Sequence, residues 1–376
     1  ERNHYSLNLS RVLESMCLRF VIAVSILHFV SSFKGLGDVH KRATAQPEII
    51  NRSFDRKKFI SAGINAILCL SIQLKPESSA ASIQKTVLNS ETLPNRSTVN
   101  MQYEMLKNGL RLEDQANYAD AERQWTELID EFNAPLWRES SNGNKYLLAR
   151  AYANRGGAMA CMGRQKEALS DYSSALNLVP DKYEFWLCRG MAYEGLADEI
   201  TFQNDSTFSD VAVFYETALS DYDRAMVLDP AEPMVYTLRG DVMVALRKYT
   251  EALESFKKGL MLNPSLTDIR CKVAMSELQC GNIAQSNAMI VSVLNGNYER
   301  PDMILAKAIV EWKVGNFAES KELFKRASMI DSRLVDYEYL THSLRWPEDP
   351  AKFVGSLRSG TKSRIENIYA LAGEDA

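Results

Sequence analysis

Histidine is scarce in this sequence, and its scarcity limits the chemistry that the protein can perform. Only four histidines occur in 376 residues, at His4, His28, His40 and His342. We expect the first three to leave with a targeting segment, so His342 alone could serve a Ser-His-Asp or Cys-His site. Glycine-rich phosphate loops are lacking as well, because neither GxGxxG nor GxxxxGKS/T occurs. The sequence therefore predicts a protein that is not an enzyme and has no cofactor.

Cysteines are few, and their spacing gives no sign of a metal site. No CxxC pair occurs, and the six cysteines are scattered: Cys17, Cys69, Cys161, Cys188, Cys271 and Cys280. A zinc site needs three or four such ligands close together. We expect no metal, and we expect the cysteines to behave as small buried hydrophobic residues.

Positive charge is lacking where a nucleic-acid surface would need it. The formal net charge is -4. Residues 1–81 hold 11 Lys and Arg against 6 Asp and Glu, whereas residues 82–376 hold 33 against 42. Phosphate binding requires clustered basic residues. The acidic main part of the chain therefore argues against nucleic acid as a partner.

Residues 1–81 are predicted to be a targeting presequence. A basic cluster at 56–58 precedes the apolar run 59–74, and small residues follow at 78–82. This order is the layout of an export signal that is cleaved close to Ala81. An uncleaved anchor is the alternative, and the N-terminal segment would then be the chain's contact with a membrane. An earlier apolar run, at residues 18–30, is shorter than the roughly 20 residues that span a bilayer.

The same segment resembles a bipartite plastid presequence. Arg56, Lys57, Lys58, Phe59 and Ile60 resemble a twin-basic export signal, with Lys57 in place of the second arginine. A basic, acid-poor stretch precedes them, as in presequences that deliver proteins through the stroma to the thylakoid lumen. The resemblance implies a chloroplast protein of the thylakoid lumen.

A secreted or membrane-anchored protein outside plastids is the competing expectation. Asn95-Arg96-Ser97 and Asn204-Asp205-Ser206 would then be glycan acceptors. In either case residues 82–101, which are rich in Ser, Thr and Asn, are predicted to be a linker.

Beyond residue 100 the sequence contains an internal repeat. Four positions recur at identical spacing in two places: Gly156, Ala168, Tyr172 and Pro180, then Gly240, Ala252, Phe256 and Pro264. The period is 34 residues, as between Gly281 and Gly315. Such a period with small residues at fixed places predicts helix-turn-helix units that stack into a solenoid.

These residues resemble the tetratricopeptide-repeat family, which has small, aromatic and proline residues at these places. The resemblance implies an all-α, right-handed superhelical solenoid of about six hairpins over 102–346, with a C-terminal capping helix. The expected parts are units 102–135, 149–182, 183–232, 233–266, 267–300 and 301–334, a cap at 335–346, and a tail or short helix at 347–376. Sixteen residues are inserted in the third unit near 198–213, and we expect them to project from the hairpin loop.

The resemblance also implies where a protein partner would bind. In this family the first helices of the hairpins line a concave groove. The candidate groove residues are Arg150, Leu187, Met191, Glu194, Met234, Asp241, Met275, Leu305, Ile309 and Trp312. The Lys and Asn that clamp a carboxylate tail in some relatives are absent, since Ala153 and Gly157 stand there. The groove suits an apolar helix or peptide; alternatively, closure of the superhelix buries it.

Three arginines precede the small residue of a unit: Arg155, Arg189 and Arg239. Asp171 and Asp221 stand where they could meet the first two. An anion-binding ladder is one interpretation, and salt bridges between packed helices are the simpler one. Taken together, the sequence predicts a non-enzymatic scaffold that holds another protein, with assembly or maintenance of complexes in the thylakoid lumen as its sharper form.

Overall fold

The computed structural model describes residues 96–134, 143–202, 208–296 and 300–359. The predicted presequence at 1–81 lies outside these residues, as does most of the predicted linker. Residues 96–101, at the end of that linker, are helical instead, because they form the first turns of α4 (Arg96–Asp114).

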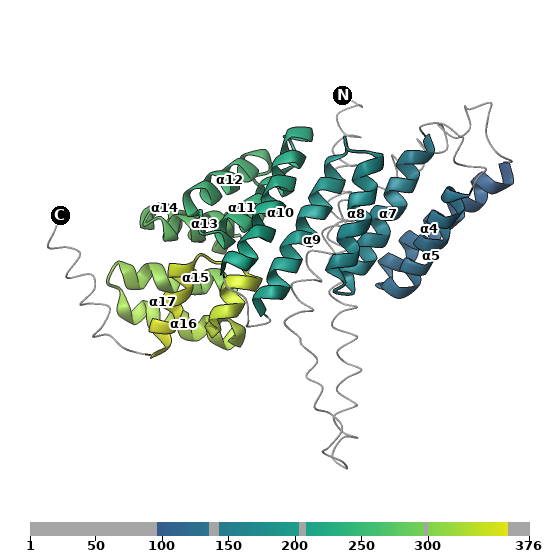
Figure 1. Cartoon of the computed structure of the whole chain (residues 1–376). Coiled ribbons are helices and arrows are strands. Elements are labelled where there is room, and N and C mark those ends of the chain that lie inside the picture. Colours follow the sequence, from purple (N-terminus) through teal and green to yellow (C-terminus); the bar gives the residue numbers. More distant parts are fainter. Residues whose placement is uncertain (1–95, 135–142, 203–207, 297–299, 360–376) are drawn as a thin grey trace, which may run out of the picture. The chain divides into compact units, whose positions relative to one another are not determined.

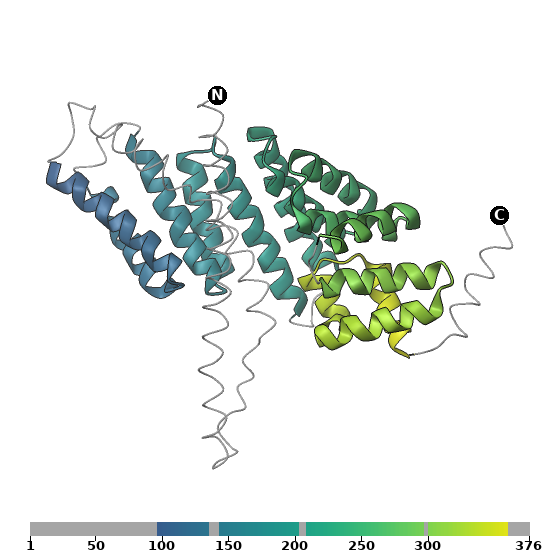
Figure 2. The ribbon, with the colours of Figure 1, turned by 180° about the vertical axis from the view of Figure 1, so that it is seen from behind.

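Thirteen α-helices and no strand occur within the described ranges. They run α4 and α5 (Tyr118–Asn133), α7 (Gly143–Cys161) and α8 (Gln165–Leu178), α9 (Tyr183–Phe202) and α10 (Phe208–Leu228), α11 (Pro233–Ala245) and α12 (Tyr249–Leu262), α13 (Thr267–Gln279) and α14 (Ile283–Leu294), α15 (Pro301–Lys313) and α16 (Phe317–Ile330), then α17 (Glu348–Ser359). Each helix of the hairpins packs against the next, so hairpin follows hairpin (Figures 1 and 2). The predicted fold class, an all-α solenoid of about six helix-turn-helix hairpins, is confirmed.

The first four hairpins close where a glycine of the first helix meets an aromatic ring of the second. A methyl group built on Gly240 would lie 2.3 Å from Phe256 Cε1, and one on Gly190 would lie 2.6 Å from Tyr222 Cε1. Both rings are almost fully buried. A larger residue at either glycine would collide with a ring that has no room to move. The repeat spacing is thus the spacing of this contact.

The inserted residues lengthen a hairpin. Helices α9 and α10 are 20 and 21 residues long, whereas the six helices from α11 to α16 have 12 to 14. The expectation of a projecting loop at 198–213 is therefore wrong for the described part: residues 198–202 continue α9 and residues 208–213 begin α10. Val211 is buried within this stretch, as are Ala197 and Tyr215 on either side of it, so the lengthened helices pack into the hairpin.

The predicted capping helix at 335–346 is replaced by irregular turns. The chain forms a 3₁₀ turn at Ser332–Val335 and a π-helical turn at Tyr339–Ser343, and the helix of this region is α17, which begins after Pro347. Arg345 has φ 54, a backbone angle that stops any helix before the proline. We refer to residues 332–359 as the C-terminal segment.

Candidate partner-binding face

The ten candidate groove residues lie on the first helices of five hairpins, as the repeat register implies. Met234 and Trp312 are half-buried. The other eight are buried: Arg150, Leu187, Met191, Glu194, Asp241, Met275, Leu305 and Ile309. Those on α13 and α15 are buried by residues of the chain's own C-terminal segment.

The C-terminal segment covers the first helices of the last two hairpins. Met275, Leu305 and Ile309 share one hydrophobic core with Trp346 and Phe353. Helix α17 contacts both α13 and α15. We call the surfaces of α9, α13 and α15 that meet the C-terminal segment the inner face.

Aromatic side chains close the far end of this contact. The rings of Trp312 and Phe353 meet edge to face, with centroids 6.1 Å apart, and Trp312 meets Phe317 in the same way at 4.8 Å. The Lys313 ammonium lies 5.6 Å from the centre of the Phe353 ring. Edge-to-face pairs of this kind add to the stabilisation that burial alone gives. Trp312 therefore packs against the chain's own C-terminal segment.

A buried ion pair anchors the segment to α9. Arg345 Nη2 donates to Glu194 Oε1 at 2.7 Å and to Asp198 Oδ2 at 2.7 Å. The side chain of Arg345 is 9% exposed, and those of the two carboxylates are 3% exposed. The Tyr222 hydroxyl donates to Glu194 Oε2 at 3.0 Å, and the Tyr215 hydroxyl donates to Asp198 Oδ1 at 2.6 Å. Each carboxylate thus uses one oxygen for a tyrosine and the other for Arg345.

Burial shifts the titration of this cluster. It raises the pKa of Glu194 to about 7, with nearby Asp198 and Asp241 acting in the same direction and Arg345 acting against them. Burial and Arg345 together lower the pKa of His342. A carboxylic acid that titrates near neutral pH is sensitive to whether its guanidinium partner stays in place.

Two further contacts hold the start of α17. Gln279 Nε2 donates to Asp349 Oδ2 at 3.0 Å, and the Asp349 backbone N–H donates to Gln279 Oε1 at 3.0 Å. Arg247 lies 3.5 Å from Glu348 Oε2. The segment is therefore attached to the hairpins at three separate places along its length.

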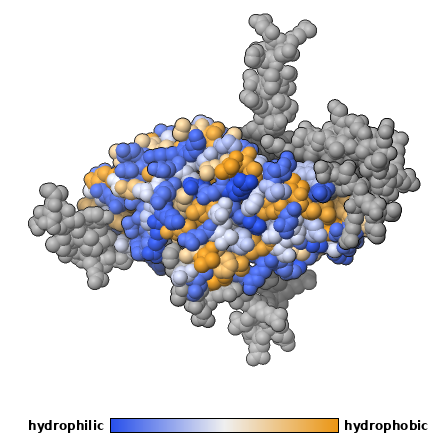
Figure 3. Space-filling model, turned by 45° about the horizontal axis from the view of Figure 1, so that its top comes forward, coloured by the Kyte–Doolittle hydropathy of each residue, from blue (hydrophilic) through white to orange (hydrophobic). Residues whose placement is uncertain are grey.

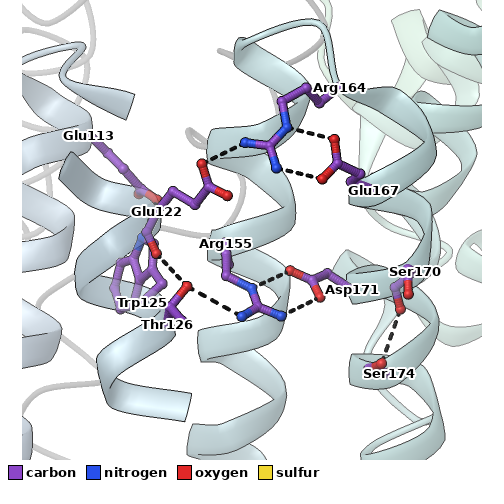
Figure 4. A network of polar contacts seen from close by, with 10 residues as sticks. All are labelled: Glu113, Glu122, Trp125, Thr126, Arg155, Arg164, Glu167, Ser170, Asp171 and Ser174. Carbon is purple, nitrogen blue, oxygen red and sulfur yellow. Dashed lines mark hydrogen bonds and ion pairs between the residues drawn. The ribbon is translucent and has the colours of Figure 1, made fainter. Parts of the chain in front are cut away.

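The arginines of the repeats form salt bridges inside the stack. Arg155 Nε and Nη2 donate to the two oxygens of Asp171 at 2.7 and 2.8 Å, and Arg155 Nη1 donates to Thr126 of the preceding hairpin at 3.3 Å (Figure 4). Arg189 makes the same bidentate contact with Asp221, with Nε and Nη2 donating at 2.8 and 2.7 Å. The simpler of the two interpretations of these arginines is thus confirmed for both pairs. Arg239 differs, since it donates to Asp223 of α10 at 2.6 Å.

Three of the four described cysteines are shielded from reaction, and Cys280 is half-buried. Cys161, Cys188 and Cys271 are buried and unbridged. Burial raises the pKa of the Cys161 and Cys271 thiols to about 12, so neither is a thiolate at neutral pH. Within the described ranges, no cluster of three or more His, Cys, Asp or Glu residues could hold a metal ion.

The outward surface is mixed in character. On the face shown in Figure 3, hydrophobic and hydrophilic residues are interspersed. Single apolar side chains stand in solvent at several helix ends, for example Met261 and Met329. No helix among the described residues is both long and apolar enough to cross a bilayer.

Sequence reasoning misses the two residues that matter most at the inner face. Asp198 lies at the start of the inserted residues, which the sequence predicts to project from a hairpin loop, and Arg345 lies outside the repeat. The repeat register puts Glu194 on the groove side, and this is the one signal of the cluster. No spacing rule connects residues 151 positions apart.

Comparison with known proteins supports the tetratricopeptide-repeat assignment. No family model matches the chain. Small glutamine-rich tetratricopeptide repeat-containing protein 2 of Mycosarcoma maydis is 26% identical over 159 residues, which cover 42% of this chain and 37% of that protein. The chain thus matches little more than a third of the length of this curated relative.

Several solved structures resemble parts of the chain. YrrB, a TPR protein with an unusual peptide-binding site, covers 55% of this chain and 92% of its own, with 18% identity and a TM-score of 0.42. PilF of Pseudomonas aeruginosa covers 61% of this chain and 92% of its own, with 16% identity and a TM-score of 0.47. A thermophilic TPR protein of Thermus thermophilus, TTC0263, covers 56% of this chain and 98% of its own, with 20% identity and a TM-score of 0.40.

Proposed function

We propose that this chain is a non-enzymatic scaffold that holds another protein on the first helices of its hairpins. The observation that carries the proposal is the docking of α17 and the turns before it on the inner face. That face already accommodates a helix and an irregular peptide, which are the two shapes that helical grooves take from partners. The tetratricopeptide-repeat character of the curated relative is consistent with the same kind of work.

The compartment that we propose is the thylakoid lumen, where the protein would help to assemble or maintain membrane complexes. The support is the order of basic, apolar and small residues in the first 81 positions. A secreted or membrane-anchored adaptor is the second candidate. The acceptor triplets at Asn95 and Asn204 favour it.

A reporter fusion separates the two compartments. Residues 1–90 are fused to a fluorescent protein, and the fusion is followed by fractionation and by mapping of the mature N-terminus. A lumenal reporter that begins near Ser82 supports the plastid proposal. A reporter in the secretory pathway, or glycans at Asn95 of the full chain, would support the adaptor and overturn the lumen.

Site-specific cross-linking tests partner binding itself. A photo-reactive residue is placed at Met234, which is half-buried on α11, and as a control at Met261, which is 74% exposed on α12. In the native compartment we expect a discrete cross-linked protein from position 234 and none of the same size from position 261. Equal cross-linking from both positions would show that the first helices have no special role.

A further inference from the structure

We propose that the inner face is a binding site for a protein segment in which an arginine is followed by an aromatic residue, and that the chain's own Arg345-Trp346 occupies it until such a partner displaces it. The proposal rests on the scaffold function proposed above and names the chemistry of the partner. The partner that we commit to is another protein, and exchange with a second copy of this chain is an outcome that the test distinguishes.

The site selects a positive charge. Glu194 and Asp198 are 3% exposed, and each directs one oxygen to Arg345 Nη2. An uncharged occupant would leave two carboxylates buried without a counter-ion, which is costly. Tyr215 and Tyr222 satisfy the remaining oxygens. The cation that completes this cluster is Arg345.

The cation that suits this site is a guanidinium. Arginine stays charged when it is buried, and it is more weakly hydrated than a lysine ammonium. Taking it out of water therefore costs less. An arginine-bearing segment should occupy the site better than the same segment with lysine.

The residue that follows the arginine fills the apolar part of the site. Trp346 is 3% exposed and packs in the same core as Met275 and Leu305. Burial of a large ring supplies most of the apolar free energy at such a contact. An arginine without an aromatic neighbour would satisfy the charge and leave the apolar part of the site uncovered.

The chain's own segment is held on this face at a conformational cost. Arg345 has φ 54, and the preceding turn is π-helical. Both are backbone states that persist only where surrounding contacts enforce them, and both are found frequently at functional sites. A partner that presents the same two side chains on relaxed backbone would bind the face with an advantage over the internal segment.

The test uses the full chain and a labelled peptide of residues 337–359. Two chain variants are compared, Arg345→Ala and Arg358→Ala, because Arg358 is an exposed arginine of the same segment that lies apart from the Glu194–Asp198 cluster. Loosening the internal segment should open the face, so we expect the Arg345→Ala chain to bind the peptide at least tenfold more tightly than the Arg358→Ala chain. Equal binding by the two variants would overturn the proposal.

A second measurement avoids any loss of folding in the Arg345→Ala chain. A protease site is inserted after Tyr337, which is exposed between the two turns, and the otherwise unchanged chain is cut there. Wild-type peptide should exchange with the cut segment, the Arg345→Lys peptide should bind severalfold more weakly, and the Arg345→Ala peptide at least tenfold more weakly. The Arg358→Ala peptide should match the wild type. Equal affinities of all four peptides, or no exchange at all, would overturn the site.

The mass of the intact chain separates a partner from a second copy. We expect the chain to remain monomeric over the concentrations used. A dimer that dissociates on addition of the wild-type peptide would show that the segment belongs to a second copy, and it would overturn the partner that we name. Failure of these peptide experiments leaves the cross-linking from position 234 unaffected, so the scaffold proposal is judged separately.

Discussion

Two regions of the solenoid use arginine–carboxylate pairs in opposite ways. In the early hairpins, Arg155 pairs with Asp171 and Arg189 with Asp221, 16 and 32 residues away, inside one hairpin in each case. In the late region, Arg345 reaches Glu194 across 151 residues. The early arginines are 18% and 20% exposed, whereas Arg345 is 9% exposed. Local pairs reinforce a contact that the repeat already makes, while the distant pair creates a contact that nothing else in the sequence implies.

The largest effect is expected where the distant pair is broken. Arg345→Ala leaves Glu194 and Asp198 buried without a counter-ion, and breaking a buried pair in this way costs about 3–5 kcal/mol. Denaturant unfolding of the full chain measures the loss. Arg358→Ala is the control and should be neutral. A cost below about 1 kcal/mol for Arg345→Ala, the range of exposed pairs, would place the two classes of pair on an equal footing.

The pH dependence should come next. Because the folded-state pKa of Glu194 is raised to about 7 from 4.5, the folded chain binds a proton that the unfolded chain has released. The stabilisation is complete below pH 4.5 and is lost as the pH rises through 7, by up to about 3 kcal/mol. Glu194→Gln should flatten this part of the stability profile. Parallel profiles for wild type and variant would contradict the shift.

Packing of the local repeat gives the third effect. Gly240→Ala puts a methyl group 2.3 Å from the buried Phe256 ring, and overpacking of this kind costs about 1–3 kcal/mol. Gly355→Ala is the matched control, because nothing lies within 4 Å of that position in α17, and alanine favours a helix over glycine. Thermal unfolding should show the first variant destabilised and the second unchanged or stabilised.

A local pair should matter less than the distant one. Arg155→Ala removes a two-pronged contact to Asp171 that remains partly open to water, so we expect a loss of about 1–2 kcal/mol. Arg123→Ala, at an arginine that is 77% exposed, serves as the control and should have a much smaller effect, as exposed ion pairs do. If Arg155→Ala costs as much as Arg345→Ala, distance in the sequence is not what separates the two regions.

The smallest effect tests the hairpin turns. Ala116 has φ 54, where the turns of three later hairpins have glycine at φ 77, 79 and 91. Ala116→Gly relieves this strain and should stabilise the chain by up to about 1 kcal/mol. Ala119→Gly, inside α5, should have the opposite sign because glycine weakens a helix. Chemical denaturation of the two variants gives the comparison.

The early region could be predicted from the sequence because each of its contacts repeats. Gly156 and Gly240 stand the same distance before their aromatic partners, so one spacing rule located the complete hairpins. The turns of the later units followed from Gly281 and Gly315, which have the positive φ that such turns need. Helix α7 begins at Gly143, before the predicted unit 149–182, since the repeat pattern carries no signal for extra turns at its start.

The late region could not be predicted, and the physical reason is the same in each case. Asp198 lies in an insertion, where the repeat register does not predict which face of the helix a residue occupies. Arg345 lies beyond the last repeat, in a backbone state that sequence patterns do not reveal. Residues 335–346, predicted as a capping helix, lie mostly in turns, and the helix begins only after Pro347. The ten groove residues remain predictions as partner contacts, and eight of them are buried.

Arg345 should also change the order in which the helices unfold. A stack in which every hairpin touches only its neighbours can unravel from either end, one unit at a time. A tie from the last segment back to α9 removes that freedom from the C-terminal end. Helices α9 to α17 should then lose their amide protection together in hydrogen exchange, while α4 and α5 fray independently of them.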